Sequence, residues 1–166
     1  MSDTDAEASA DEARIVPAVA GHADAAERIV REAFDGVSID QAIERALGRG
    51  RLPWQDVKAA AVRREIETRP KDCFVAVAGD EVVGVVTTSA DEAIGRGTIV
   101  NLAVRADRRG RGLGRRLIEH ALGEFRRRGL IEAKIETLAC NPVGQRLYPS
   151  VGFREVARQI HYAMRL

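Results

Sequence analysis

Membrane spans, disulfides and aromatic clusters are all unexpected in this chain of 166 residues. No run of about 18 consecutive apolar residues occurs, so no membrane-spanning helix is predicted. Cysteine is confined to Cys73 and Cys140, which is too few for a disulfide framework and favours a reducing, cytoplasmic setting. Aromatic residues make up 4% and the net charge is +1, so no general attraction to nucleic acid or membrane is expected. The length suits one globular domain with one core.

The first thirteen residues are acidic and carry no apolar stretch. Such a segment has too little apolar surface to bury, so residues 1–13 are predicted to form a disordered acidic tail. They also lack the apolar stretch of a secretion signal. The folded domain is therefore expected to comprise residues 14–166.

Hydrophobic periodicity within this domain predicts alternating groups of strands and helices. The expected strands are 14–19, 73–78, 81–88, 98–104 and 131–138, with one or two more in 155–166. The expected helices are 24–34, 39–47 (opened by a capping box at Ser38), one that begins near Pro53 and ends before Pro70, 113–129 and 142–148. This order indicates an α+β fold with a mixed, mostly antiparallel sheet and helices on both faces. It does not fit the regular strand–helix alternation of a dinucleotide-binding fold.

A glycine-rich turn joins the strand 98–104 to the helix 113–129. Its sequence is Arg109-Gly110-Arg111-Gly112-Leu113-Gly114, followed by Arg115. Glycines allow a ligand to approach the backbone closely, and the free N–H groups at a helix start bind anions. The turn therefore predicts a pyrophosphate cradle, to which the three arginines add positive charge.

Other interpretations of this turn remain open. A Rossmann fingerprint would need a third glycine where Arg115 stands, and a P-loop would need Gly-Lys-Ser/Thr, which is absent. The glycines would serve chain reversal alone if no ligand binds there. A basic nucleic-acid patch over residues 105–116 would be expected to have interleaved aromatic residues, which this stretch lacks.

Two motifs in this order resemble the GNAT family of N-acetyltransferases. The first is the Arg-x-x-Gly-x-Gly core formed by Arg109, Gly112 and Gly114, although Ala106 stands where family members usually have proline. The second begins at Asn141 and continues with Tyr148 and the pair Gly152-Phe153, similar to the family pattern N-x(6)-Y-x(3)-G-F. The resemblance covers residues 14–166 and includes some likeness to acetyltransferases of protein N-termini.

The resemblance implies a V-shaped cleft where the strands 98–104 and 131–138 diverge at a bulge. The pantetheine arm of acetyl-coenzyme A would then bond to the strand edge at Leu102, Ala103 and Val104, and the oxyanion would meet a backbone N–H at the bulge near Val104. The implied coenzyme-binding residues are Leu102, Ala103, Val104, Arg109, Gly110, Arg111, Gly112, Leu113, Gly114, Arg115, Asn141 and Tyr148. No metal is expected.

Tyr148 matches the family position of the acid that protonates the departing thiolate, and the alternative is a half-buried core tyrosine. Glu136 matches the strand glutamate of relatives that acetylate protein N-termini, where it would act as general base. The alternative for Glu136 is a solvated carboxylate beside Lys134. Asn101 either orders a water or satisfies polar groups of its strand.

The expected function is transfer of an acetyl group from acetyl-coenzyme A to a primary amine, either of a peptide or protein N-terminus or of a small molecule. Alternatives are transfer of another acyl group, or a degenerate protein that only holds coenzyme A. A monomer or a homodimer is expected, without a nucleic-acid or membrane partner. The residues 24–68, which would shape the acceptor side, carry no recognition motif.

Overall fold

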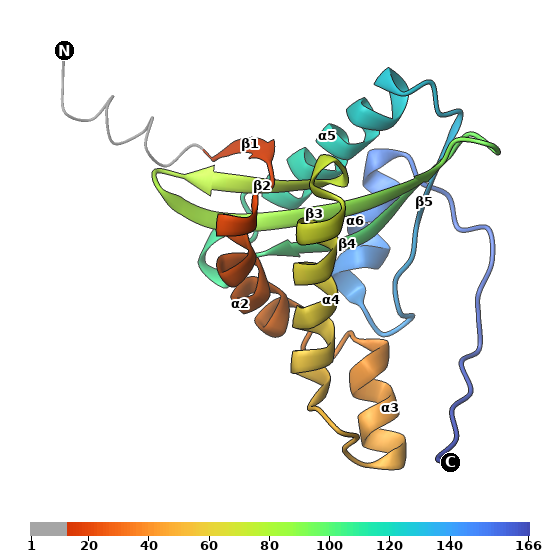
Figure 1. Cartoon of the computed structure of the whole chain (residues 1–166). Helices are drawn as coiled ribbons and strands as arrows, with labels where there is room; N and C mark the ends of the chain where they lie inside the picture. The colour runs from red at the N-terminus through yellow and green to blue at the C-terminus, as the bar shows by residue number, and fades with distance from the viewer. Residues whose placement is uncertain (1–12) are drawn as a thin grey trace.

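The computed structural model describes residues 13–166, and its centre is a sheet in the order β1-β2-β3-β4-β5 (Figure 1). The strands are β1 (Arg14–Pro17), β2 (Cys73–Ala78), β3 (Glu81–Asp91), β4 (Arg96–Val104) and β5 (Glu132–Ile135). Neighbouring strands from β1 to β4 are antiparallel, and β5 is parallel to β4. The predicted α+β class with a mixed, mostly antiparallel sheet is confirmed.

Helices cover both faces of this sheet. They are α2 (Ala23–Ala33), α3 (Ile39–Leu47), α4 (Trp54–Thr68), α5 (Leu113–Arg127) and α6 (Pro142–Val151), with short 3-10 turns η1 (Ala20–His22), η2 (Pro70–Asp72) and η3 (Ala106–Arg108). Alternation along β2 shows how the faces divide. Phe74 and Ala76 belong to the core cluster with α5, whereas Cys73 and Val75 belong to the cluster with α2 and α4. None of the helices in the described part of the chain is long and apolar enough to cross a membrane.

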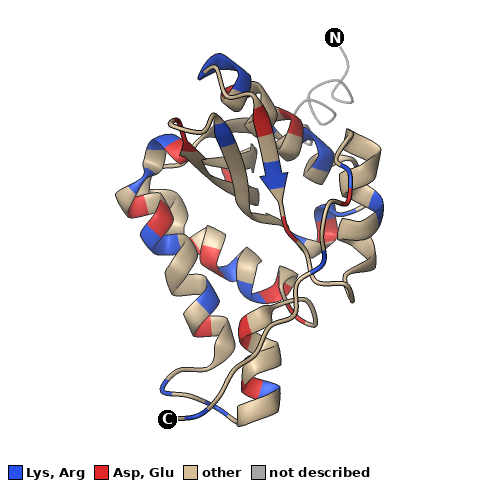
Figure 2. Ribbon diagram, turned by 90° about the vertical axis from the view of Figure 1, so that its right-hand side faces the viewer, with Lys and Arg blue, Asp and Glu red and all other residues tan. Residues whose placement is uncertain are grey.

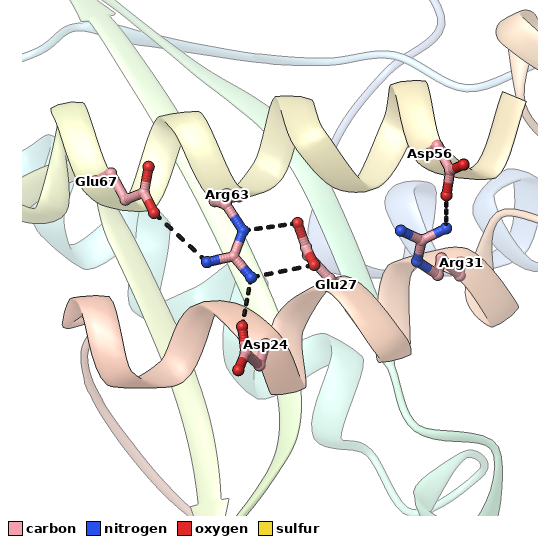
Figure 3. Close-up of polar contacts among 6 residues, drawn as sticks. All are labelled: Asp24, Glu27, Arg31, Asp56, Arg63 and Glu67. Carbon is pink, nitrogen blue, oxygen red and sulfur yellow. Dashed lines mark hydrogen bonds and ion pairs between the residues drawn. The ribbon is translucent and has the colours of Figure 1, made fainter. Parts of the chain in front are cut away.

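A group of ion pairs ties α2 to α4 (Figure 3). The Arg63 guanidinium on α4 donates to both carboxylate oxygens of Glu27 on α2, with its Nε 2.8 Å from Oε1. The same guanidinium contacts Asp24, and a second pair joins Arg31 to Asp56 nearer the other end of the two helices. These ion pairs fix the relative orientation of α2 and α4. The apolar side chains of the two helices pack together in one core cluster: Ile29, Val30, Val62 and Ile66.

The C-terminal segment is the main departure from the predicted fold. Residues 154–166 form no strand, so the prediction of one or two strands in 155–166 is wrong. β5 is also shorter than the predicted strand 131–138, because the chain after Ile135 leaves β4 and no longer pairs with it. α6 extends beyond the predicted 142–148 and contains Pro149 within its last turn.

Two smaller predictions concern Ser38 and the end of the tail at Ala13. The predicted capping box of α3 does not form: the Ser38 side chain makes no capping bond, and the Gln41 amide bonds to Asp35 and Gly36 instead of reaching back to Ser38. Ala13, predicted as the end of the tail, is buried, and its carbonyl accepts a bond from Arg116. The rest of the predicted tail, residues 1–12, lies outside the described residues.

Two glycine-to-alanine changes near α5 are expected to shift stability in opposite directions. At Gly97 a new Cβ would lie 2.5 Å from the Phe125 ring, so Gly97→Ala should lower the free energy of unfolding by about 1–3 kcal/mol. Gly123 lies within α5 with open space around it, so Gly123→Ala should raise that free energy by about 0.5–1 kcal/mol. Urea unfolding of both variants and the parent checks this. If Gly97→Ala were as stable as the parent, the close packing of the Phe125 ring against Gly97 would be contradicted.

Candidate active site

A hollow forms where β4 and β5 part. Their parallel pairing runs only from Arg96↔Glu132 to Ile99↔Ile135. β4 carries a register shift against β3 at the same point, where Thr87 faces Asn101 but Thr88 faces Ile99, so that Val100 is the extra residue of a bulge. The hollow beyond it encloses about 90 Å³. Its lining is Ala33, Phe34, Val37, Ile99, Val100, Leu102, Ile135, Glu136, Thr137, Asn141 and Tyr148.

The position of this bulge corrects one expectation. The bulge lies at Val100 and not near Val104. Val100 directly follows Ile99, the last residue of β4 that pairs with β5. The bulge also reverses the alternation of β4, so Ile99 and Leu102 pack with the same core cluster although they are three residues apart. From Val100 to Val104 the edge of β4 that faces away from β3 has no strand partner among the described residues. The backbone groups of this edge therefore lack a strand partner, although the Val104 carbonyl accepts a bond from Arg109 Nε.

Tyr148 lies on α6 and its side chain borders the hollow. Asn141 positions this helix, because its side-chain oxygen accepts the N–H groups of Val143 and Gly144, each at 3.2 Å. The Asn141 amide also donates to Thr137 Oγ1 at 2.9 Å. Burial raises the pKa of the Tyr148 phenol, and a hydrogen bond with Thr137 partly opposes that rise. Tyr148 is therefore held as a neutral hydroxyl at the wall of the hollow.

Glu136 follows the last residue of β5 and borders the same hollow. Its carboxylate lies 2.6 Å from the Lys134 ammonium, and its side chain is 61% exposed. Glu136 is thus a solvated carboxylate paired with Lys134, and it stands at the rim of the hollow. Glu136 and Tyr148 reach the hollow from different elements, one from the end of β5 and the other from α6.

The glycine-rich turn has the shape that an anion would need. Gly110 and Gly112 have φ of 76° and 79°, and a Cβ built on either would meet no atom within 4 Å. α5 begins directly after Gly112 with no side-chain cap and no acidic residue in its first turn. The free N–H groups of that turn and the open space beside them therefore fit a phosphate group. Gly114 differs, because its Cβ position lies 3.4 Å from Leu147 of α6.

The arginine side chains of the turn have different hydrogen-bond partners. Arg109 Nε donates to the carbonyl of Val104 at 2.9 Å, which ties the turn to the end of β4. Arg115 points instead to the end of α6, where it donates to the carbonyl and the hydroxyl of Ser150. The side chain of Ala103 packs with α2 and α4 on the face away from α5, so it does not line the cleft. Leu113 is buried in the core beneath the turn.

Several residues of the site could not be identified from the sequence. Ala33, Phe34 and Val37 supply the wall from the end of α2, and in the sequence they look like ordinary apolar positions. Thr137 contacts Asn141 but belongs to no motif. Asn101, which is 3% exposed, donates to Glu65 of α4 and to Thr87, each at 2.9 Å. That geometry supports the structural interpretation of Asn101, although its Oδ1 has no protein partner.

Solved structures of N-acetyltransferases share this fold. The PaiA N-acetyltransferase of Thermoplasma acidophilum, in complex with coenzyme A, has a TM-score of 0.70 at 17% identity and covers 86% of this chain and 90% of that chain. The ribosomal-protein-S18-alanine N-acetyltransferase of Escherichia coli has a TM-score of 0.64 at 23% identity and covers 87% of this chain and 79% of its own. At such identities the likeness establishes the fold alone.

The family follows from the sequence. The model of the acetyltransferase (GNAT) family matches residues 39–153, and this chain belongs to that family. The predicted resemblance is thereby confirmed. The match includes the glycine-rich turn, both parting strands and α6, and it ends at Phe153.

Two curated acetyltransferases are similar in sequence to part of this chain. The "[ribosomal protein bS18]-alanine N-acetyltransferase" of Salmonella typhimurium is 40% identical over 65 residues, which are 39% of this chain and 44% of that protein. Human "N-alpha-acetyltransferase 30" is 31% identical over 100 residues, 58% of this chain and 28% of that protein. The chain thus spans less than half of the length of these relatives.

Gly112→Glu is expected to abolish binding of coenzyme A. The new side chain would enter the open space beside the start of α5 and bring negative charge to it, in a backbone conformation that side chains rarely adopt. Isothermal titration with coenzyme A checks the affinity. Gly129→Glu is the matched control, because Gly129 also has a positive φ and open surroundings but follows the opposite end of α5. Parental affinity in Gly112→Glu would rule out the cradle.

Proposed function

We propose that this protein transfers an acetyl group from acetyl-coenzyme A to an α-amino group at the N-terminus of a peptide or protein. The observation that carries the proposal is that Glu136 and Tyr148 border the same hollow, at the point where β4 and β5 part. Membership of the acetyltransferase family supports the reaction class. The names of the relatives, one an alanine N-acetyltransferase and the other an N-alpha-acetyltransferase, support the acceptor class.

The donor would be held largely by the backbone. The first turn of α5 and the glycines before it would bind the pyrophosphate, with Arg109 and Arg111 contributing positive charge. The unpaired edge of β4 at Leu102 and Val104 would bond to the pantetheine arm, and its thioester would lie near the bulge at Val100, whereas the backbone groups of Ala103 face β3. Asn141 would act by fixing the start of α6, and with it Tyr148.

The transfer requires two proton movements. Glu136, directly or through a water, takes a proton from the attacking amine as the new C–N bond forms. Tyr148 donates its phenolic proton to the sulfur as the C–S bond breaks. A backbone N–H at the bulge near Val100 stabilises the negative charge on the carbonyl oxygen. The raised pKa of Tyr148 suits this role, because the phenol must carry its proton when the thiolate departs.

Tyr148→Phe tests the acid role. It removes one hydroxyl with little change in volume, so kcat should fall by about 10²-fold while the affinity for coenzyme A stays near that of the parent. A tyrosine that only bonds its neighbours would instead cost about 1 kcal/mol of stability and leave kcat unchanged. Steady-state and single-turnover rates, with melting temperatures on the same preparation, distinguish the two, and the single-turnover rate shows whether product release masks the chemical step.

The pH profile of Tyr148→Phe provides a further prediction. The acid works only when protonated, and burial raises its pKa above the ordinary tyrosine value. The parent should therefore keep its activity to a higher pH than an exposed tyrosine would allow, and lose it as the phenol ionises. The variant should lack that basic limb. A limb of the same shape in both proteins would assign it to another group.

An acceptor panel tests the amine class. The parent is offered acetyl-coenzyme A with a peptide that has a free N-terminus, the same peptide with a blocked N-terminus and an internal lysine, a polyamine and an aminoglycoside. Mass spectrometry should locate the acetyl group on the α-amine of the free peptide. Acetylation of the aminoglycoside alone would contradict the acceptor class, and acetylation of no acceptor by a protein that still binds coenzyme A would contradict the enzyme.

A further inference from the structure

A polar row crosses the apolar cluster between the sheet and the helices α2 and α4. It consists of Cys73, Thr87 and Asn101, which face one another across β2, β3 and β4, and Thr87 is fully buried. Charged residues occur only at the ends of these strands, so charge over the middle of the sheet comes from the helices (Figure 2). Glu65 of α4 brings a carboxylate to the row, with its side chain 17% exposed. Apolar side chains would stabilise this layer more simply, which points to a role beyond packing.

The bonds of Asn101 fix the direction of its amide. Its Nδ2 donates to Glu65 Oε2 and to Thr87 Oγ1, each at 2.9 Å. An ionised carboxylate only accepts, so the nitrogen of the amide and not its oxygen must face Glu65. The other oxygen of Glu65 lies 3.7 Å from the Arg69 guanidinium, which helps to hold the carboxylate over the sheet. Asn101 is thus attached at once to the neighbouring strand β3 and to the helix α4.

Asn101 directly follows Val100, the extra residue of the bulge in β4. The position of a bulge decides to which face of the sheet the following side chains point. Asn101 lies opposite Thr87 because the extra residue is Val100, and with the extra residue one position later Val100 would lie there instead. Both bonds of the Asn101 amide would then be lost, and the Glu65 carboxylate would stay buried without this donor. The two bonds therefore favour the observed position of the bulge over its neighbour.

We propose that Asn101 is a positioning residue for acyl transfer: held by Glu65 and Thr87, it fixes the bulge at Val100. Through the bulge it fixes the direction of the backbone N–H that meets the carbonyl oxygen of the thioester. Asn101 does not line the hollow, whereas its neighbours Val100 and Leu102 do, so it acts through the backbone and not by contact. The inference rests on the proposed function, since only a bound thioester needs an N–H at that place.

Substitutions that preserve side-chain shape test this positioning. Asn101→Asp sets a second carboxylate against Glu65, so the bulge should lose its fixed place and kcat should fall by about 10²-fold. The affinity for coenzyme A should stay near that of the parent, because the proposed phosphate cradle lies at the start of α5. Thr88→Val is the matched control, since it removes another buried hydrogen bond of β3, from Thr88 to the Asp72 carbonyl, and should leave kcat unchanged. Parental kcat in Asn101→Asp would overturn the positioning.

The pH dependence of Asn101→Asp separates positioning from a plain loss of stability. Two carboxylates this close raise the pKa of one of them, so they share a proton at low pH. The protonated form of the new side chain can donate to Glu65 as the amide does, so kcat relative to the parent should fall as the pH rises through that raised pKa. Arg69 and Lys58 of α4 and the Cys73 thiol of β2 also lie near Glu65. These groups are present in both proteins, so their titration cancels in the ratio. A ratio that stays low and constant with pH would refute the positioning.

Glu65 provides a second pair of variants if Asn101→Asp does not fold. Glu65→Ala removes the acceptor of the Asn101 amide and should lower kcat by a similar factor. Glu65→Gln keeps an oxygen that can accept from that amide, so it should recover most of the loss. An equal loss in both variants would show that the charge of Glu65 is itself required, which would refute positioning through Asn101.

Hydrogen exchange tests the bulge without any assay of transfer. The amides of β4 that pair with β3 should exchange faster in Asn101→Asp and in Glu65→Ala than in the parent, whereas amides between β1 and β2 should be unchanged. Equal exchange in β4 would refute the positioning whatever the activity. An inactive parent would contradict the proposed function, and fully active variants would contradict the positioning alone, so the two failures are distinct.

Discussion

The parting of β4 from β5 is the constraint on which the rest of this site depends. Parallel strands that pair for only four residues leave two backbone edges open to each other beyond Ile99 and Ile135. Normally such edges carry a desolvation cost, since buried N–H and C=O groups require partners. Here they face a hollow, so a bound chain can satisfy them. The bulge at Val100 makes the separation abrupt, because it turns β4 out of register with β3 just where β5 ends.

α5 links this cleft to the glycine-rich turn. Its inner face, from Leu113 to Phe125, packs under the sheet, and the ring of Phe125 lies against Gly97 of β4. At its other end Gly114 allows Leu147 of α6 to come close, and Arg115 bonds to Ser150 at the end of α6. The turn, β4 and α6 thus form one packed unit, so the proposed acid Tyr148 has a fixed position relative to the proposed phosphate cradle.

Local signals in the sequence account for what was predicted well. The hairpin of β2 and β3, the end of α3 at Gly48 and the start of α5 all follow from periodicity and from glycines at positive φ, which are properties of the nearby chain. The bulge at Val100 could not be predicted, because it depends on the register between β4 and two neighbours at once. The C-terminal segment has a clear strand pattern yet forms no strand, because pairing depends on a partner and alternation alone does not supply one.

The same distinction separates the donor side of the site from the acceptor side. The proposed donor side is built from glycines and backbone groups, so its sequence requirements are strict and visible as a motif. The proposed acceptor side is a wall of ordinary apolar side chains from the end of α2 and the turn after it, such as Phe34, whose ring also lies 4.1 Å from the Lys58 ammonium. That wall is positioned by the packing of α2 on α4 and by ion pairs such as Arg63 with Glu27, far from the hollow itself. Under the proposed function, acceptor choice would depend on how α2 and the turn after it are placed, and single apolar residues such as Ala33, Phe34 and Val37 leave no readable motif in residues 24–68.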